Sequence, residues 1–380
     1  MVSKTAQRVK PFLAMEVMDE IQRLRQKADD VISFSVGEPD LPPPDCVKEA
    51  CIQAIREDFT KYTHSQGLLE LRQAICDHYA KRYGVSITPD RVLVTEGTSP
   101  ALFLLFAVLL EAGDQVILTN PCYPCYPNTV RFFRGKPVFV PVREEEGFQY
   151  RTKDIQKKIT KRTKGILINS PSNPTGHLIS ETTLREIASL KTTIISDEIY
   201  HGLVYQGRER SILEFTDNAF VLNGFSKAYA MTGFRLGYLI APKKFIRPMQ
   251  VLHQNFYISA NSFVQRAGIA ALKKGGADQE KMRQIFARRQ QVMLEGVARL
   301  GLKVAKPPEG AFYVFANAKQ FTNDSYRFAF DLLKKTHVGV TPGIDFGTRG
   351  EGFLRFSYAV PEKTIREGLR RVGDYLKKYG

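Results

Sequence analysis

The sequence predicts an α/β protein whose mostly parallel sheet lies between layers of helices. From residue 91 onward, short apolar segments typical of strands alternate with longer segments that have helical periodicity. Residues 165–168 form a continuous apolar run, which is the pattern of a strand buried on both faces of a parallel sheet. From residue 306 onward the pattern indicates a second, smaller α/β unit. A chain of 380 residues is long enough for two packed regions of this kind.

Composition places the protein among soluble globular chains, with 43% hydrophobic and 25% charged residues. Residues 1–10 are polar and basic with no apolar core after them, so no secretory leader is expected. The longest apolar run, residues 101–110, is too short to span a membrane. We therefore expect a cytoplasmic protein with no membrane partner.

The net charge of +16 is concentrated in residues 131–164, which hold eleven basic and four acidic residues. Such a bias can mark a nucleic-acid surface, but no nucleic-acid motif and no basic run interleaved with aromatic residues accompanies it. We therefore favour a solvated face and expect no nucleic-acid partner. A positive field also attracts anionic cofactors and carboxylate substrates.

Five cysteines, an odd number, give no disulfide framework. Cys122 and Cys125 form a C-x-x-C pair, which can indicate zinc or redox chemistry. There is no second pair, and Pro121, Pro124 and Pro127 make the segment a stiff turn. We therefore expect no metal site here.

The first part of the chain predicts a helix over residues 11–28 and a strand over residues 31–36. The strand ends in a G-E-P-D sequence that contains Gly37, and by residue chemistry alone this is simply a turn. A helix predicted over residues 44–57 then leads to Tyr62, for which plain packing is the simplest interpretation.

Two strands in the next part, over residues 92–94 and 116–118, are each followed by residues suited to a binding site. After the first, a helix opens with three small or hydroxyl residues, Gly97, Thr98 and Ser99. Its free backbone amides need a cap and also suit a phosphate, and both uses can hold at once. After the second strand, the proline-rich turn carries the aromatic residues Tyr123 and Tyr126, for which hinge packing is the simplest interpretation.

The strands over residues 165–168 and 193–195 also end in polar residues. Asn173 precedes a proline, which favours an extended backbone and a side chain that projects past the strand end. Asp197 follows its strand directly, where an acid is costly to bury without a partner unless it caps a helix. Tyr200 lies three residues further on, on the same side, whereas we interpret Glu198 as structural.

Lys227 follows an apolar strand over residues 220–222 and has small neighbours on both sides. A lysine in such surroundings can reach into a cavity, and partial desolvation makes its amine a nucleophile for a carbonyl. Arg235, eight residues on between two glycines, could bind a phosphate. The alternative is that both are ordinary solvated cations, and each of them taken alone would favour that alternative.

The last part of the chain predicts a strand over residues 236–240 and helices over residues 245–300. Arg288 and Arg289 fit a solvated helix face. Arg355 lies in an alternating strand between apolar neighbours, where it is either at a sheet edge or buried as a fork for a carboxylate.

In order, the pieces G-E-P-D, Tyr, G-T-S, Tyr, N-P-T-G, D-x-x-Y, S-K, Arg and Arg resemble those of the class I and II aminotransferases, which depend on pyridoxal phosphate. The resemblance runs from Gly37 to Arg355 and implies fold type I, as in aspartate aminotransferase. It implies a seven-stranded, mostly parallel sheet in a large cofactor domain, residues 41–290, and a smaller α/β domain. Residues 291–380 and part of an arm, residues 1–40, would form that smaller domain.

The resemblance also assigns roles. Lys227 would hold the cofactor as a Schiff base and Asp197 would keep its ring nitrogen protonated, while Asn173 and Tyr200 would bond its phenolic oxygen. Tyr123 would stack on the ring. Contacts to the phosphate are implied for Gly97, Thr98, Ser99, Ser226 and Arg235, and for Tyr62 in the neighbouring subunit of a homodimer. The substrate would contact Gly37, Asn173 and Arg355.

The implied activity moves an amino group from an L-amino acid to a 2-oxo acid in two half-reactions, with Lys227 carrying the proton. The alternatives are a β-C–S lyase on the same scaffold and a non-catalytic sensor of the cofactor or an amino acid. Two residues depart from the family's pattern. Gly224 stands where many relatives have a phosphate-binding serine. Thermophilic aspartate-type relatives carry a lysine near position 99 for a second carboxylate, whereas this chain has Ser99.

Overall fold

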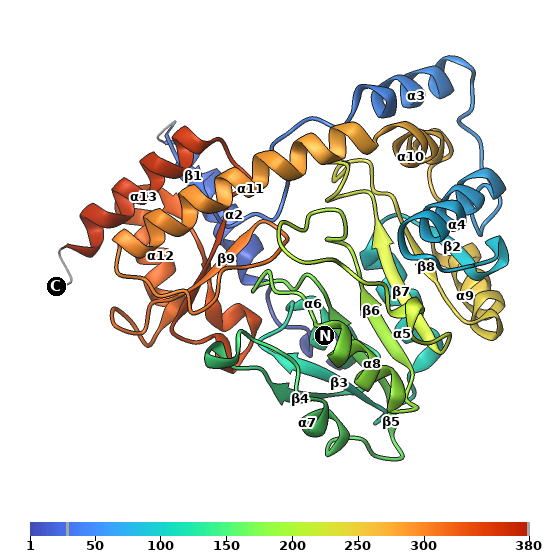
Figure 1. Ribbon diagram of the computed structural model, residues 1–380, viewed down its shortest axis with the longest axis horizontal. Helices are drawn as coiled ribbons and strands as arrows, with labels where there is room; N and C mark the ends of the chain where they lie inside the picture. The colour runs from blue at the N-terminus through green and yellow to red at the C-terminus, as the bar shows by residue number, and fades with distance from the viewer. Residues whose placement is uncertain (28–29, 378–380) are drawn as a thin grey trace.

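The computed structural model describes residues 1–27 and 30–377. Its largest sheet has seven strands in the order β2-β8-β7-β6-β5-β3-β4 (Figure 1). The strands are β2 (Val92–Thr95), β3 (Gln115–Asn120), β4 (Lys136–Pro141), β5 (Thr163–Asn169), β6 (Ile194–Asp197), β7 (Ala219–Gly224) and β8 (Gly237–Ile240). β8 runs antiparallel to β2 and β7 and the other pairs are parallel, which confirms the mostly parallel sheet.

Helices cover both faces of this sheet, as the apolar runs of its strands require. Alternate residues of β5 point to opposite faces: Ile166 and Ile168 join one core cluster and Leu167 joins the other. The covering helices are α3 (Asp45–Arg56), α4 (Leu69–Tyr83), α5 (Thr98–Leu109), α6 (Cys125–Phe132), α7 (Thr152–Gln156), α8 (Glu181–Ser189), α9 (Lys243–Phe256) and α10 (Ser262–Lys274). The core clusters place α5, α6 and α9 on one face and α4, α8 and α10 on the other.

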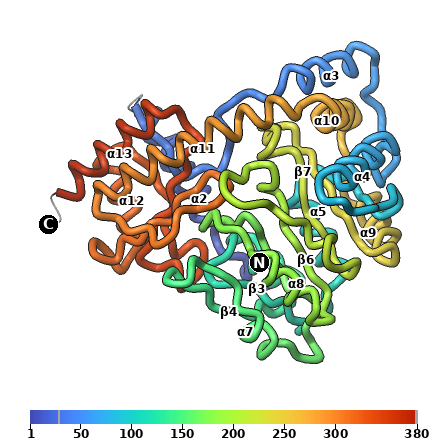
Figure 2. Tube along the Cα trace, in the orientation of Figure 1, coloured from blue at the N-terminus to red at the C-terminus, as the bar shows by residue number. Residues whose placement is uncertain are grey.

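A second, smaller unit combines the C-terminal part of the chain with the N-terminal segment, as expected. An antiparallel sheet has the order β11-β12-β9, and β1 from the N-terminal segment pairs with β10. Its strands are β1 (Ile32–Ser33), β9 (Tyr313–Asn317), β10 (Val338–Gly339), β11 (Thr341–Pro342) and β12 (Phe353–Ser357). Its helices are α2 (Leu13–Arg25), α11 (Gly276–Arg299), α12 (Ser325–Thr336) and α13 (Glu362–Leu376), with the short α1 (Lys4–Gln7) before them. Figure 2 shows the blue N-terminal trace lying among the orange and red C-terminal segments.

The division at residues 40 and 290 stays a proposal, because α11 is continuous through residue 290. The strand predicted over residues 31–36 shortens to β1, since only two of its residues pair with β10. The helix predicted over residues 11–28 is α2, and residue 28 lies outside the described residues. The edge strand β4 lies inside the charged stretch and was not expected from its pattern.

The expectation of a solvated helix face is wrong for Arg289. Its side chain is 6% exposed and donates to both carboxylate oxygens of Asp40, at 2.6 and 3.0 Å. This fork ties α11 to the G-E-P-D turn, so the aspartate of that turn has a structural partner in a distant helix. Within the described residues, no helix has both the length and the apolar character needed to cross a membrane.

Candidate active site

A cavity of about 720 Å³ opens where β5, β6 and β7 end, and segments from both units line it. The parallel register places Asn169 beside Asp197, and Asp197 beside Leu222. The Asn169 side chain donates to the Asp197 carbonyl at 2.9 Å and accepts from the Asn173 backbone N–H at 2.8 Å. Since carboxyl ends of neighbouring parallel strands meet at one edge, the segments that follow these three strands lie close together.

Asp197 is buried in the wall of this cavity and is 6% exposed. Its carboxylate accepts from the Tyr126 hydroxyl at 2.6 Å and from the Ile199 backbone N–H at 3.1 Å. Burial raises the pKa of Asp197 to about 6, although both hydrogen bonds act to lower it. A cation placed in the cavity would hold this carboxyl in its ionised form.

Lys227 reaches the same cavity from the loop that follows β7, so its amine and the Asp197 carboxylate open onto one space. The amine donates to the Gly37 carbonyl at 2.6 Å. Burial lowers the pKa of Lys227 to about 8, with Glu38 opposing the shift. A useful fraction of the amine is therefore unprotonated near neutral pH, as a nucleophile for a carbonyl requires.

The N-terminus of α5 and the Lys227 loop form a cup suited to an anion. Thr98, Ser99, Ser226 and Arg235 line the cavity there. Gly97, at φ 106°, lies behind them, and a Cβ on it would come within 2.7 Å of the Arg235 guanidinium. The glycine therefore lets the guanidinium lie against the start of a twelve-residue helix, whose free amides favour negative charge.

The departure at Gly224 has a steric reason. A Cβ on Gly224 would lie 2.9 Å from the Cα of Gly237 in β8. The two strands therefore meet too closely for a serine at this position, and Ser226 is the hydroxyl residue of this loop that lines the cavity.

Arg355 lines the cavity from the smaller unit, at a place called the Arg355 end below; it lies in the central strand β12 and is 2% exposed. Its guanidinium donates to the Asn173 side chain at 2.8 Å, to the Thr341 hydroxyl at 3.2 Å and to the Ser35 carbonyl. It lies 4.3 Å from the ring centre of Tyr313.

No carboxylate in the described part of the chain lies within ion-pair distance of Arg355, and its Nε has no hydrogen-bond partner there. A buried cation without an anion is costly, so a carboxylate placed at this end of the cavity would pair with the guanidinium.

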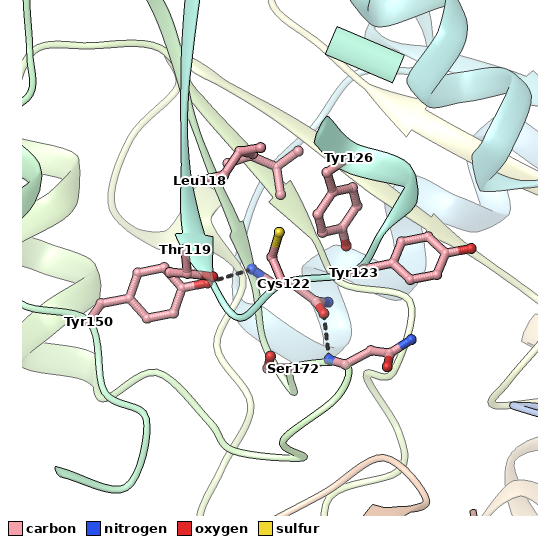
Figure 3. A pocket seen from close by; sticks show the side chains of 10 residues that line it. Leu118, Thr119, Cys122, Tyr123, Tyr126, Tyr150 and Ser172 are labelled. Carbon is pink, nitrogen blue, oxygen red and sulfur yellow. Dashed lines mark hydrogen bonds between the residues drawn. The ribbon is translucent and has the colours of Figure 1, made fainter. Parts of the chain in front are cut away.

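Aromatic side chains close the wall between these two ends. Tyr123, from the turn after β3, and Tyr126, from the first turn of α6, line the cavity there. Figure 3 shows these two side chains in a smaller neighbouring pocket, which Cys122 and Tyr150 also line. The Tyr123 and Tyr126 rings meet edge to face at 5.2 Å. Tyr200 is buried and its hydroxyl lies 2.9 Å from that of Tyr313.

The structure therefore brings the predicted residues together around one space. Those that line the cavity are Gly37, Thr98, Ser99, Tyr123, Asn173, Asp197, Tyr200, Ser226, Lys227, Arg235 and Arg355. Gly97 supports the cup from behind, as described above. Tyr62 does not line the cavity and is 81% exposed.

Sequence reasoning missed several supporting residues. The interpretation of Tyr126 as hinge packing is incomplete, because its hydroxyl bonds Asp197. Asn169, which ends β5, links Asn173 to Asp197. Its position at a strand end was a usable signal, whereas the contact of Thr341 with Arg355 joins segments that no local pattern connects.

The comparisons with known proteins agree with this geometry. Residues 29–372 match the family model described as aminotransferase class I and II. The chain is 40% identical to a probable aspartate/prephenate aminotransferase of Aquifex aeolicus, over 97% of both proteins. It is 38% identical to a (5-formylfuran-3-yl)methyl phosphate transaminase of Methanocaldococcus jannaschii, over the full length of both.

Among solved structures, the aspartate aminotransferase of Thermus thermophilus with maleate superposes with a TM-score of 0.94. That chain is 36% identical, and the match covers 98% of this chain and 99% of that chain. The fold, the family model and the full-length relatives agree. The chain therefore belongs to the class I and II aminotransferase family and is an aminotransferase.

Proposed function

We propose that this aminotransferase works with pyridoxal phosphate bound between the α5 cup and Asp197, and that Lys227 holds it covalently. The observation that carries this proposal is the shared cavity of Lys227 and Asp197. One group is an amine whose pKa falls to about 8, and the other is a buried acid that has no ion-pair partner within the described residues. Both needs are met by a ligand with an aldehyde and a protonatable ring nitrogen.

The other residues fit the remaining parts of that cofactor. Thr98, Ser99, Ser226 and Arg235 would hold its phosphate, Tyr123 would pack on its ring, and Asn173 and Tyr200 would bond its phenolic oxygen. When bound, the cofactor supplies an electron sink for the bonds at the substrate α-carbon. Lys227 would move the proton from that carbon, and Asp197 would keep the ring nitrogen charged.

Arg355 would bind the α-carboxylate of the amino-acid donor and of the 2-oxo acid acceptor. A buried guanidinium whose hydrogen-bond partners within the described residues are all neutral can make a bidentate pair with that group. Gly37 would lie beside the substrate, because its carbonyl already reaches the Lys227 amine.

A homodimer with shared sites is part of the same proposal. Tyr62 is 81% exposed, and the segment after it binds the segment after α9, since the Thr63 backbone N–H donates to the Ser259 hydroxyl at 3.3 Å. Phe256 and Ile258, which come just before Ser259 in the sequence, are also exposed. An apolar surface of this kind suits a subunit interface that delivers Tyr62 to the neighbouring cofactor phosphate. We also propose a cytoplasmic location, as the composition led us to expect.

The alternatives to this proposal are a β-C–S lyase and a non-catalytic sensor. The full-length relatives described above carry aminotransferase names, and those names favour neither alternative.

The test replaces Lys227 with alanine. Covalent attachment is measured by borohydride reduction and intact mass, and turnover by half-reactions with each standard amino acid. Wild-type protein should gain the mass of one cofactor, whereas Lys227→Ala should gain none and lose at least about 10⁴-fold in rate. Lys161→Ala, at an exposed lysine, is the control and should behave as wild type. Covalent cofactor on Lys227→Ala, or a wild type that no amino acid discharges, would overturn the proposal.

A further inference from the structure

We infer that the preferred donors are amino acids with an aromatic side chain, and that Phe12 is the residue that selects them. This inference rests on the proposed function and concerns the part of the cavity that the cofactor and the α-carboxylate leave free. The apolar residues that line the cavity and have no role in the proposed function include Phe12, Met15, Leu102 and Cys125, and the Phe12 ring packs against that of Tyr123.

The wall that these residues form is apolar, and one side of it consists of aromatic rings. Phe12 meets Tyr123 edge to face, with ring centres 5.7 Å apart and an angle of 85° between the planes. Met15 and Leu102 add flexible and branched apolar surface. Burial raises the pKa of the Cys125 thiol to about 11, so this group stays neutral. A flat apolar side chain would complete the contacts that Phe12 and Tyr123 begin.

The charges in the cavity argue against a second carboxylate on the substrate. The cations that line it within the described residues are Lys227, Arg235 and Arg355. Each already has a role in the proposed function, toward the cofactor's aldehyde, its phosphate and the α-carboxylate. The charged group left over is Glu38, an acid, which would repel a carboxylate on the substrate side chain. Aspartate and glutamate would therefore place a charge where this chain offers no partner.

Phe12 is held in place by hydrogen bonds on both sides. Ahead of it, Lys10 and Asn128 exchange two hydrogen bonds, at 3.2 and 3.0 Å. Behind it, the backbone N–H groups of Leu13 and Ala14 donate to the two carboxylate oxygens of Asp345, at 3.0 and 3.2 Å. The segment that carries Phe12 is thus fixed against both units before a substrate arrives. A fixed wall discriminates between side chains better than a loose segment, because binding does not have to order it and less conformational entropy is lost.

The experiment measures binding without turnover, by calorimetry on cofactor-loaded protein. The probes are 3-phenylpropionate and succinate, which share the single carboxylate that Arg355 would bind and differ at the far end. Wild type should bind 3-phenylpropionate at least about tenfold more tightly than succinate. Phe12→Ala should lose about tenfold for 3-phenylpropionate and little for succinate. Val9→Ala, an exposed position of the same segment that does not line the cavity, should match wild type.

Phe12→Leu separates ring from bulk, because it keeps apolar surface at the same place. It should recover only part of the affinity for 3-phenylpropionate. Equal binding of the two probes by wild type, or an unchanged ratio in Phe12→Ala, would overturn the inference while transamination stands. A protein that discharges its cofactor with aspartate faster than with phenylalanine would do the same. If no amino acid discharges the cofactor, the proposed function itself fails, and that result is read from the cofactor absorbance rather than from probe binding.

Discussion

The two ends of the cavity are built in opposite ways. At the sheet end, Asn169, Asp197 and the Lys227 loop come from neighbouring parallel strands within about sixty residues of sequence. At the Arg355 end, the guanidinium contacts Ser35, Asn173 and Thr341, which come from segments far apart in the chain.

The two ends also differ in their acid–base chemistry. Burial brings the pKa of Asp197 up to about 6 and that of Lys227 down to about 8, so both groups titrate near neutrality. An arginine keeps its charge at any pH at which the protein is folded. The sheet end is therefore suited to moving protons, and the Arg355 end is suited to holding a charge without exchanging one.

Among conservative substitutions, which keep the size or the charge of the side chain, the largest effect is expected at the Arg355 end. Arg355→Lys keeps the positive charge but loses the planar fork, and a buried carboxylate would then lose one of its two hydrogen bonds. We expect kcat/KM for the amino donor to fall by about 10²-fold, through KM more than kcat, with cofactor affinity unchanged. Arg349→Lys, at an exposed position of the preceding loop, is the matched control. A loss of cofactor affinity with an unchanged KM would contradict the separation of the two ends.

A smaller effect is expected at the sheet end. Tyr126→Phe removes the hydroxyl that donates to Asp197 at 2.6 Å. Because this hydrogen bond lowers the pKa of Asp197, its loss raises that pKa further and leaves less carboxylate between pH 6 and 7. We expect cofactor affinity at pH 6.5 to fall about tenfold, and the acidic limb of the binding curve to move to higher pH.

Fluorescence titration of the cofactor from pH 5.5 to 8 measures both quantities for Tyr126→Phe. Tyr326→Phe, at a half-exposed tyrosine of α12, should leave the curve in place. If the variant loses affinity equally at every pH, the hydroxyl acts by packing alone and the sheet end is not tuned in this way.

The contrast between the ends also explains what sequence could predict. Strand ends and short motifs predicted Asp197, Asn173 and Lys227 because a parallel sheet turns local order along the chain into proximity in space. The seven-stranded, mostly parallel sheet was predicted on the same basis, with the resemblance to a known family supplying the strand count.

The rest depends on contacts between distant segments. Arg289 was expected in solvent because its neighbours in α11 are polar, and only the fold brings Asp40 to it. The contacts of Arg355 with Ser35 and Thr341, and the position of Phe12 over Tyr123, have the same origin. No local pattern encodes which distant segment will cover a side chain.

The smallest effect on activity is expected one residue from Asp197. Glu198 faces the interior and accepts hydrogen bonds from Ser196, Ser211 and Tyr79 at 3.1, 3.1 and 3.2 Å. Burial raises its pKa from 4.5 to about 8, so the folded chain binds more protons than the unfolded chain between those values. The protonated Glu198 side chain therefore contributes to the free energy of unfolding. This contribution is fully present below pH 4.5 and is lost as the pH rises through 8, by up to about 1.4 kcal/mol per pH unit. Glu198→Gln should flatten the slope of the urea midpoint against pH and leave kcat/KM within twofold. A change in the pH dependence of kcat/KM in Glu198→Gln would instead show that Glu198 takes part in the proton transfers at the sheet end.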